Sequence, residues 1–329
     1  MKKVLFATSA LVLSAGFASA EVALSGDGRM GMIYDGNDAQ FSSRARVRFN
    51  LSGESDAGLS FGASFRVDQE NYNGNQYRSA ARGTAGAIWI SGTYGKLSMG
   101  DVVSAAEQAI GDLYEVGYTD GSFAGDVEEI AYLTADGVNI NQGPNILYEY
   151  TINNISLYAS ASDGSDTDWF TTVGDDVDDE LDAESDQVAW SLAGKYEAET
   201  WWVGLAYSKH DEAKEIVLGA EAKFNQFSVK GIYADYKNRG NIDIGGSNWS
   251  DEVAELNNTA NGYEMDKTLG LSAAYQLDAV LIEGFWRRDE FKTDVAAVED
   301  KDFDSFGIGA EYDLGGGAVL AGGIVDSDY

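Results

Sequence analysis

The sequence contains no cysteine, one proline and one histidine among its 329 residues. The lack of cysteine excludes disulfide frameworks, thiolate metal sites and thiol catalysis. Imidazole-based catalysis has little support, because the single histidine, His210, has no nucleophile motif beside it. The sequence therefore does not indicate an enzyme.

Basic residues are also scarce. The chain has 22 Lys and Arg against 55 Asp and Glu, which gives a formal net charge of -33. Nucleic acid is not expected as a partner, because its binding needs Lys and Arg to displace counterions from phosphates. An aromatic content of 12% argues against an acidic disordered chain, which would be poor in aromatic residues.

Long apolar runs are missing after the N-terminus, where no stretch reaches the roughly 18 apolar residues that a transmembrane helix needs. The N-terminus itself combines two lysines, the mostly apolar residues 4–16 and the small residues 18–20. This pattern predicts a signal peptide over residues 1–20 that exports the chain from the cytoplasm. The mature chain is then either soluble outside the cytoplasm or crosses a membrane as strands.

The mature chain shows a strong alternation with a period of two residues. In residues 44–51 the even positions are arginine or asparagine and the odd positions are apolar, and residues 59–68, 188–197 and 305–314 repeat the pattern. Such alternation predicts strands, and short polar connections between them predict hairpins. We predict fifteen strands, near residues 22–35, 40–54, 58–70, 84–94, 96–103, 145–152, 155–163, 186–199, 201–210, 215–224, 227–236, 266–276, 279–290, 303–313 and 317–327.

The length of these strands and the composition of their faces indicate the class. Strands in soluble sandwiches are usually about 5 or 6 residues long, whereas a tilted strand needs about ten to cross a bilayer. The apolar faces mix bulky residues with Gly and Ala, which suits lipid contact, and the polar faces suit a watered interior. We therefore expect residues 21–329 to form an all-β, transmembrane, antiparallel up-and-down β-barrel that encloses an aqueous channel.

Five segments also carry a resemblance to a known family: Glu21–Asp27, Phe41–Arg44, Gly58–Phe65, Gly111–Asp120 and Tyr312–Ala318. They resemble the general trimeric porins of the bacterial outer membrane, of the Rhodobacter type found in alphaproteobacteria. The resemblance implies a 16-stranded barrel, a homotrimer in the outer membrane of a Gram-negative cell, and passive diffusion of small hydrophilic solutes and ions. Its surroundings would be outer-membrane lipid and lipopolysaccharide.

The C-terminus departs from this family pattern. Members end in a strand whose last residue is aromatic and which closes the barrel against the first strand. This chain ends at Asp326–Tyr329, in a position expected for the last external loop. We therefore expect the last strand of the 16 to be missing.

The charges suggest how the channel selects ions. From Leu97 to Gly194 there is no Lys or Arg but there are 21 Asp and Glu. The polar faces of the first three predicted strands instead carry five arginines: Arg29, Arg44, Arg46, Arg48 and Arg66.

The resemblance implies that the long segment 104–144 folds into the barrel and constricts it. It would set four acidic residues against the arginines: Glu107, Asp112, Glu115 and Asp120. Since rows of charge at a constriction decide selectivity, and the chain is strongly acidic, we expect weak cation selectivity. Alternatively, the acidic residues are simply solvated, and the arginines pair within the wall with Asp27 and Asp68.

The acidic tract over residues 175–182 lies in a predicted external loop. Asp175, Asp176, Asp178 and Asp179 are weak candidates for loose Ca²⁺ or Mg²⁺ association, but the spacing is not that of an EF-hand. No cofactor is expected to be required.

An alternative interpretation is an exported acidic calcium-binding surface β protein, such as an adhesin. That class would need short strands or glycine-aspartate repeats, and the sequence has neither. A requirement for detergent separates the two classes.

Overall fold

The computed structural model describes residues 21–34, 39–72, 76–77, 86–116, 127–134, 145–162, 188–240, 262–296 and 298–328. The proposed signal peptide, Asp120 and the acidic tract 175–182 lie outside these residues.

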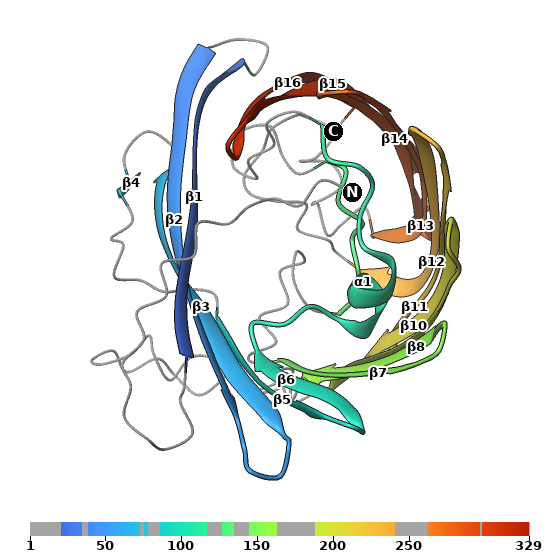
Figure 1. Ribbon diagram of the computed structural model, residues 1–329. Helices are drawn as coiled ribbons and strands as arrows, with labels where there is room; N and C mark the ends of the chain where they lie inside the picture. The colour runs from blue at the N-terminus through green and yellow to red at the C-terminus, as the bar shows by residue number, and fades with distance from the viewer. Residues whose placement is uncertain are drawn as a thin grey trace, which may run out of the picture.

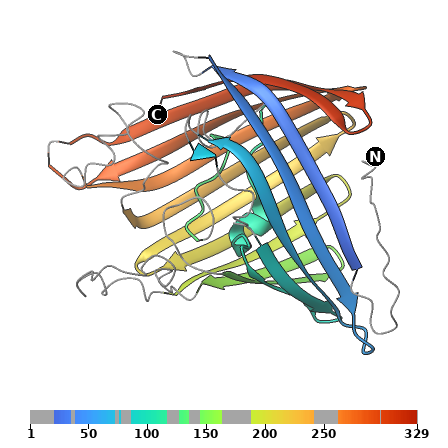
Figure 2. The same ribbon diagram turned by 90° about the vertical axis from the view of Figure 1, so that its left-hand side faces the viewer.

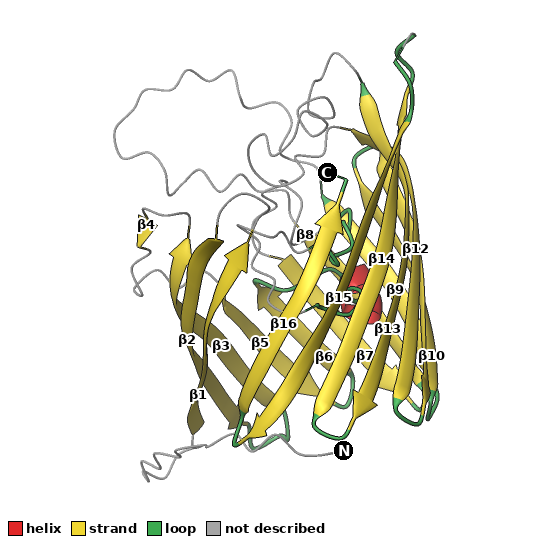
Figure 3. Cartoon of the chain, turned by 90° about the horizontal axis from the view of Figure 1, so that it is seen from above, coloured by secondary structure: helices red, strands yellow, loops and turns green. Residues whose placement is uncertain are grey.

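Fifteen strands of the described chain form one antiparallel sheet in which each strand pairs with its neighbours along the sequence. The sheet curls around a central space (Figure 1). Its neighbouring strands lie side by side and run diagonally across the molecule (Figure 2). The strands of this path are β1 (Glu21–Tyr34), β2 (Ala39–Glu54), β3 (Ser60–Tyr72), β5 (Gly86–Gly92), β6 (Gly95–Gly100), β7 (Asn145–Ile152), β8 (Ile155–Ser162), β9 (Ala189–Glu197), β10 (Trp201–His210), β11 (Ala213–Phe224), β12 (Phe227–Gly240), β13 (Tyr263–Leu277), β14 (Val280–Thr293), β15 (Lys301–Gly315) and β16 (Ala318–Ser327). The strands β1 and β16 are the two ends of the path and lie at the two edges of the sheet (Figure 3).

The predicted fold class and the fifteen predicted strands are confirmed. Two described elements were not predicted: the two-residue strand β4 (Gln76–Tyr77), which pairs with β3, and the helix α1 (Ala105–Ile110). No helix in the described part of the chain is long and apolar enough to cross a membrane.

Because side chains alternate between the two faces of each strand, the outer and inner faces of the sheet differ in composition and exposure. In β10 the side chains of Val203 and Leu205 point outward and are exposed, whereas Trp202, Ala206 and Ser208 point inward and are buried. The large apolar side chains on the outer face have no protein to cover them, which is the pattern of a surface solvated by lipid.

The short connections are tight hairpins, and the residue type at the first position of the turn favours the backbone conformation that they need. Several hairpins turn through an Asn or Asp with a positive φ, a conformation that these two residue types tolerate better than most. These residues are Asn153, Asp211, Asn225 and Asp278, with φ between 49° and 55°.

The outer face can be tested with two adjacent substitutions in β5. Ile88 is 61% exposed on the outer face, and its neighbour Ala87 lies on the inner face. We expect Ile88→Arg to destabilise the folded barrel by about 2–4 kcal/mol, because it places a charge in hydrocarbon, and Ala87→Arg to have a much smaller effect. Equilibrium folding into lipid vesicles at increasing urea measures both variants. Equal losses would show that the faces are assigned wrongly.

Candidate pore constriction

The helix α1 lies inside the curve of the sheet, against β8 to β11 (Figure 1). Serine side chains satisfy the N–H groups at its start, which have no partner within the helix. The Ala105 N–H donates to Ser160 Oγ on β8 at 2.9 Å, and the Ala106 N–H donates to Ser191 Oγ on β9 at 3.1 Å. Ser104 caps the same turn by accepting from the Glu107 N–H at 3.1 Å.

The end of α1 fits into a part of the wall made of small residues. A Cβ atom added at Gly219 would lie 2.5 Å from Ile110 Cγ2, and one added at Gly204 would lie 3.3 Å from Ile110 Cγ1. Glycine at these two inward positions of β10 and β11 therefore allows the helix to approach the backbone of the wall.

The hydrophobic core of the molecule lies between this loop and the inner wall. Loop residues such as Ala106, Ile110 and Tyr132 pack with inward residues of the strands, among them Val217 and Ile232, and all five are buried. Burial of this apolar surface holds the loop against one side of the barrel.

Charged side chains of the wall bind the second described part of the loop, residues 127–134. Arg239 of β12 donates to the carbonyl oxygens of Ala131 and Tyr132, and Tyr236 donates to the same Ala131 oxygen at 3.0 Å. Glu215 of β11 accepts from the Leu133 N–H at 3.2 Å. Since Arg239 and Glu215 are buried, these bonds form where water does not compete.

Arg287 of β14 makes a second attachment of the loop. Its Nη1 donates to the carbonyl oxygens of Val127 and Glu129, each at 2.7 Å. Its Nε forms an ion pair with the buried Asp289 at 2.7 Å, which fixes the direction of the guanidinium group.

The two parts of the loop are also bound to each other. The Ile130 N–H donates to Asp112 Oδ1 at 2.7 Å, and the Tyr132 hydroxyl donates to the Gly111 carbonyl oxygen at 2.9 Å. Burial raises the pKa of Tyr132 well above its ordinary value, so the phenol stays neutral and keeps its proton for this bond. The Asp112 carbonyl oxygen in turn accepts from Lys230 of β12.

The predicted acidic residues fall in three different environments. Glu107 lies in α1, and one carboxylate oxygen of Asp112 is occupied by the loop backbone. Glu115 is exposed and interacts electrostatically with Glu283 of β14 and Glu311 of β15.

The predicted basic residues form a continuous patch on one face of β1 to β3. In the register of these strands, Arg29 stands opposite Arg44, and Arg48 stands opposite Arg66. The arginine patch consists of Arg29, Arg44, Arg46, Arg48 and Arg66. One ion pair within the wall is present, between Arg44 Nη2 and Asp27 Oδ2 at 3.8 Å.

The loop and the arginine patch belong to different sides of the barrel. The loop packs on β7 to β16, whereas the patch lies on β1 to β3, across the central space from α1 (Figure 1). The loop and the arginine patch therefore lie on opposite sides of the inside of the sheet (Figure 1).

The sequence analysis did not identify the residues that anchor the loop: Glu215, Lys230, Arg239 and Arg287. The available signal for Lys230 and Arg287 was a basic residue at an inward position of a predicted strand. Arg239 gave no such signal, because β12 shifts its register between Asp235 and Arg239 and thereby reverses the parity.

The structure does not test the proposed loose cation sites, because the acidic tract is outside the described residues. Within the described ranges, no group of three or more His, Asp or Glu side chains could hold a metal ion.

A transmembrane up-and-down barrel with a loop attached to its inner wall defines a channel protein of the bacterial outer membrane. The family model for Gram-negative porins matches residues 7–329, and the chain belongs to this family. It is therefore a porin of the outer membrane and not an enzyme.

Individual proteins agree with this assignment. A porin of Rhodobacter capsulatus is 36% identical over 317 residues, which cover 94% of this chain and 95% of that protein. A porin of Fuscovulum blasticum is 28% identical over 65% of this chain and 80% of its own length. A porin structure refined at 1.8 Å resolution has a TM-score of 0.70 and 34% identity, and covers 94% of this chain and 95% of its own. The trimer form of the outer-membrane protein OmpT of Vibrio cholerae shares the fold alone, with a TM-score of 0.60 at 10% identity.

The loop attachment through Arg287 can be tested against its neighbour Arg288. We expect Arg287→Gln to increase current noise and the mean conductance of single channels. Loss of charged hydrogen bonds worth about 1.5–3 kcal/mol should release the loop roughly tenfold to a hundredfold more often. Single-channel recording in planar bilayers measures this effect.

Arg288→Gln is the matched control, because Arg288 lies next to Arg287 on β14 but pairs with Asp304 of the neighbouring strand β15, and no bond from it to the loop is found among the described residues. Its channel should remain as quiet as the wild type. Identical noise in Arg287→Gln and the wild type would contradict a role of Arg287 in holding the loop.

Proposed function

We propose that this porin is a water-filled diffusion channel for small hydrophilic solutes and ions, narrowed by the loop of residues 104–144, with weak cation selectivity. The observation that carries the proposal is the attachment of the loop to the wall opposite the arginine patch. A loop held in this way reduces the open cross-section without closing it.

The proposed selectivity rests on the sign of the charges on the two sides of the passage. In this proposal the arginine patch lines one side of the passage, and the loop carries Glu115, which interacts with Glu283 and Glu311, on the other. Opposed charges at a narrow point produce a field across the passage, and the net charge of -33 enriches cations at its mouths. Asp112 contributes less to this field in our proposal, because its carboxylate also holds the loop together.

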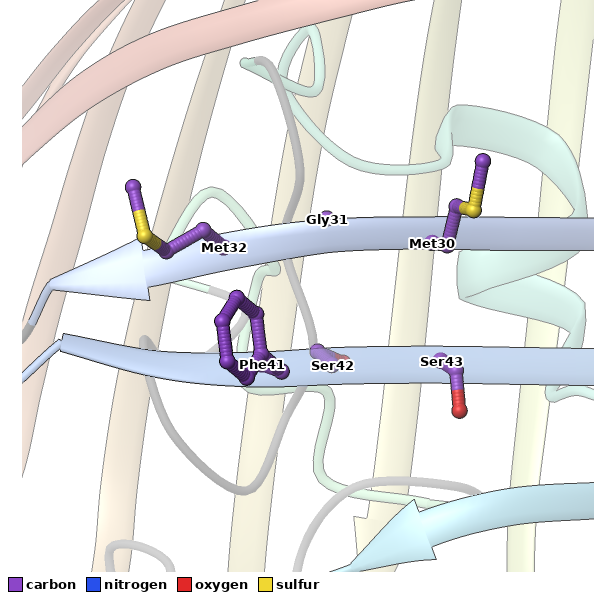
Figure 4. A pocket seen from close by; sticks show the side chains of 6 residues that line it. All are labelled: Met30, Gly31, Met32, Phe41, Ser42 and Ser43. Atoms are coloured by element: carbon purple, nitrogen blue, oxygen red, sulfur yellow. The ribbon is translucent and has the colours of Figure 1, made fainter.

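We further propose that the chain is exported by a signal peptide over residues 1–20 and works as a homotrimer. The outer face of β1 and β2 supports a subunit contact there. Met30, Met32 and Phe41 project from it around a shallow hollow (Figure 4), and Met30 and Phe41 are 90% and 83% exposed. Loose association of Ca²⁺ or Mg²⁺ with the acidic loops, next to lipopolysaccharide, remains part of this proposal.

Reversal potentials across a KCl gradient test the selectivity. We expect Glu115→Gln to lower the cation preference, because it removes a negative charge from the passage, and the combined Arg44→Gln, Arg46→Gln and Arg48→Gln variant to raise it. The differences should shrink in 1 M salt, where the Debye length is about 3 Å.

Glu199→Gln, in the short exposed turn between β9 and β10, is the matched control for Glu115→Gln. It should leave the reversal potential unchanged. Equal shifts for both glutamate variants would mean that Glu115 is not at the constriction.

The trimer contact can be tested with two phenylalanines on the outer face. We expect Phe41→Ala to lower the temperature at which trimers dissociate in detergent, because the loss of a buried aromatic anchor costs about 1–2 kcal/mol per contact. Phe306→Ala on β15, where the side chain is 51% exposed, should have little effect because it loses lipid contacts alone. Gel mobility after graded heating measures both, and equal shifts would argue against a contact at β1 and β2.

The same preparations separate the channel from the alternative of a calcium-binding adhesin. A channel requires detergent and conducts ions in a planar bilayer, whereas the adhesin stays soluble without detergent and does not conduct.

A further inference from the structure

A second cavity opens on the inside of the barrel, near the end of the sheet that carries the short turns. It has a volume of about 490 Å³, within the range of small-molecule sites. Inward residues of β2, β3, β5, β6 and β7 line it, together with Gln108 of α1. The short turns of such barrels face the periplasm, so a solute leaving the constriction meets this cavity.

An indole ring forms part of the cavity wall. Trp89 of β5 stands opposite Gly62 of β3, and a Cβ atom added at Gly62 would lie 2.6 Å from Trp89 Cζ2. The glycine therefore lets the indole pack against the backbone of the barrel wall. In this position the ring also borders the cavity and offers it a flat, weakly polar surface.

Three charged residues line the cavity, Lys96, Asp101 and Glu149, and two of them form an ion pair. Lys96 Nζ lies 3.1 Å from Glu149 Oε2, and Gln108 Nε2 donates to Glu149 Oε1 at 3.1 Å. The Lys96 side chain is 45% exposed and that of Glu149 is 20% exposed, so both still face the water in the lumen. The Lys96–Glu149 pair offers hydrogen-bond donors and acceptors without a net charge of its own, and the Asp101 carboxylate adds acceptors that repel an anion, so the hydroxyl groups of a neutral solute match this lining better than an anion does.

We propose that this cavity binds a neutral, ring-shaped polyol of the monosaccharide class, and we call it the Trp89 subsite (Trp89, Lys96, Ser98, Gln108 and Glu149). The proposal rests on the proposed function as a diffusion channel. The C–H face of the ring stacks on the indole, whose face carries partial negative charge. Ring hydroxyls donate to the Glu149 carboxylate and accept from the Lys96 ammonium group, which has three N–H donors.

The Trp89 subsite joins the wall to the constriction loop. Gln108 belongs to α1, whereas its partner Glu149 belongs to β7. A polyol bound there lies beside the passage and obstructs the ion current while it stays. Binding therefore appears as a saturable reduction of the current.

The test uses the full-length trimer in planar bilayers with D-glucose and myo-inositol as probes. We expect a saturable fall of the ion current with either probe, beyond the fall in conductivity of the bulk solution. Poly(ethylene glycol) of similar mass, which has few hydroxyl donors, should give no saturable fall. If the wild-type current falls only in proportion to the bulk conductivity, the proposed subsite is overturned. The channel function is not overturned by that result, because the protein still conducts ions.

Trp89→Leu should raise the half-saturating glucose concentration about tenfold, the loss expected for one stacking contact on an aromatic ring. The matched control is Trp190→Leu, which removes an outward indole of β9 that packs with Tyr207 and should leave glucose binding unchanged. Gln108→Ala, which leaves the indole in place, should raise the same concentration severalfold. The proposed subsite is overturned if the half-saturating glucose concentration is unchanged in both Trp89→Leu and Gln108→Ala. It is also overturned if Trp190→Leu raises this concentration as much as Trp89→Leu does. If neither the wild type nor any variant conducts ions, the proposed channel itself is overturned.

Discussion

The structure depends on the need to pair every backbone N–H and C=O group that meets hydrocarbon, where no water can replace a missing partner. A meander of fifteen long strands meets this need everywhere except at the outer edges of β1 and β16, since each strand of the described sheet bonds to the next. The same strands then present alternate side chains to lipid and to water. The outer face is apolar because lipid surrounds it, and the inner face is free to carry charge.

Only part of the inner face of the sheet binds the loop. On β8 to β15 it supplies the partners of the loop: serines for the first turn of α1, glycines opposite Ile110, and the buried groups Glu215 and Arg239 for the loop backbone. A loop with so few regular backbone bonds needs such partners, because buried peptide groups without them are costly. In this protein the apolar core and the proposed constriction therefore share the same residues.

The other side of the lumen keeps its charges available to solutes. The arginine patch on β1 to β3 lies across from the loop, and the Lys96–Glu149 pair lies between them at the short-turn end. In our proposals an ion responds to the field between the arginine patch and the loop, whereas a neutral polyol binds to hydrogen-bond donors, acceptors and an indole. The two kinds of solute would then interact with different parts of one wall.

The sequence by itself determined the barrel class, the fifteen strands and the shared face of the five arginines of β1 to β3, because the two-residue period is a local property that the membrane makes unambiguous. It did not determine how the loop lies. The bond from Ile130 to Asp112 and those from Arg287 to Val127 and Glu129 join residues far apart in the chain, and no periodicity encodes them. Arg239 lies beyond the predicted strand 227–236, and the shift of register before it places its side chain on the inner face, because one irregularity in the ladder changes which side every later residue takes. Such contacts are decided only when the whole sheet has curled and brought the loop against its inner wall.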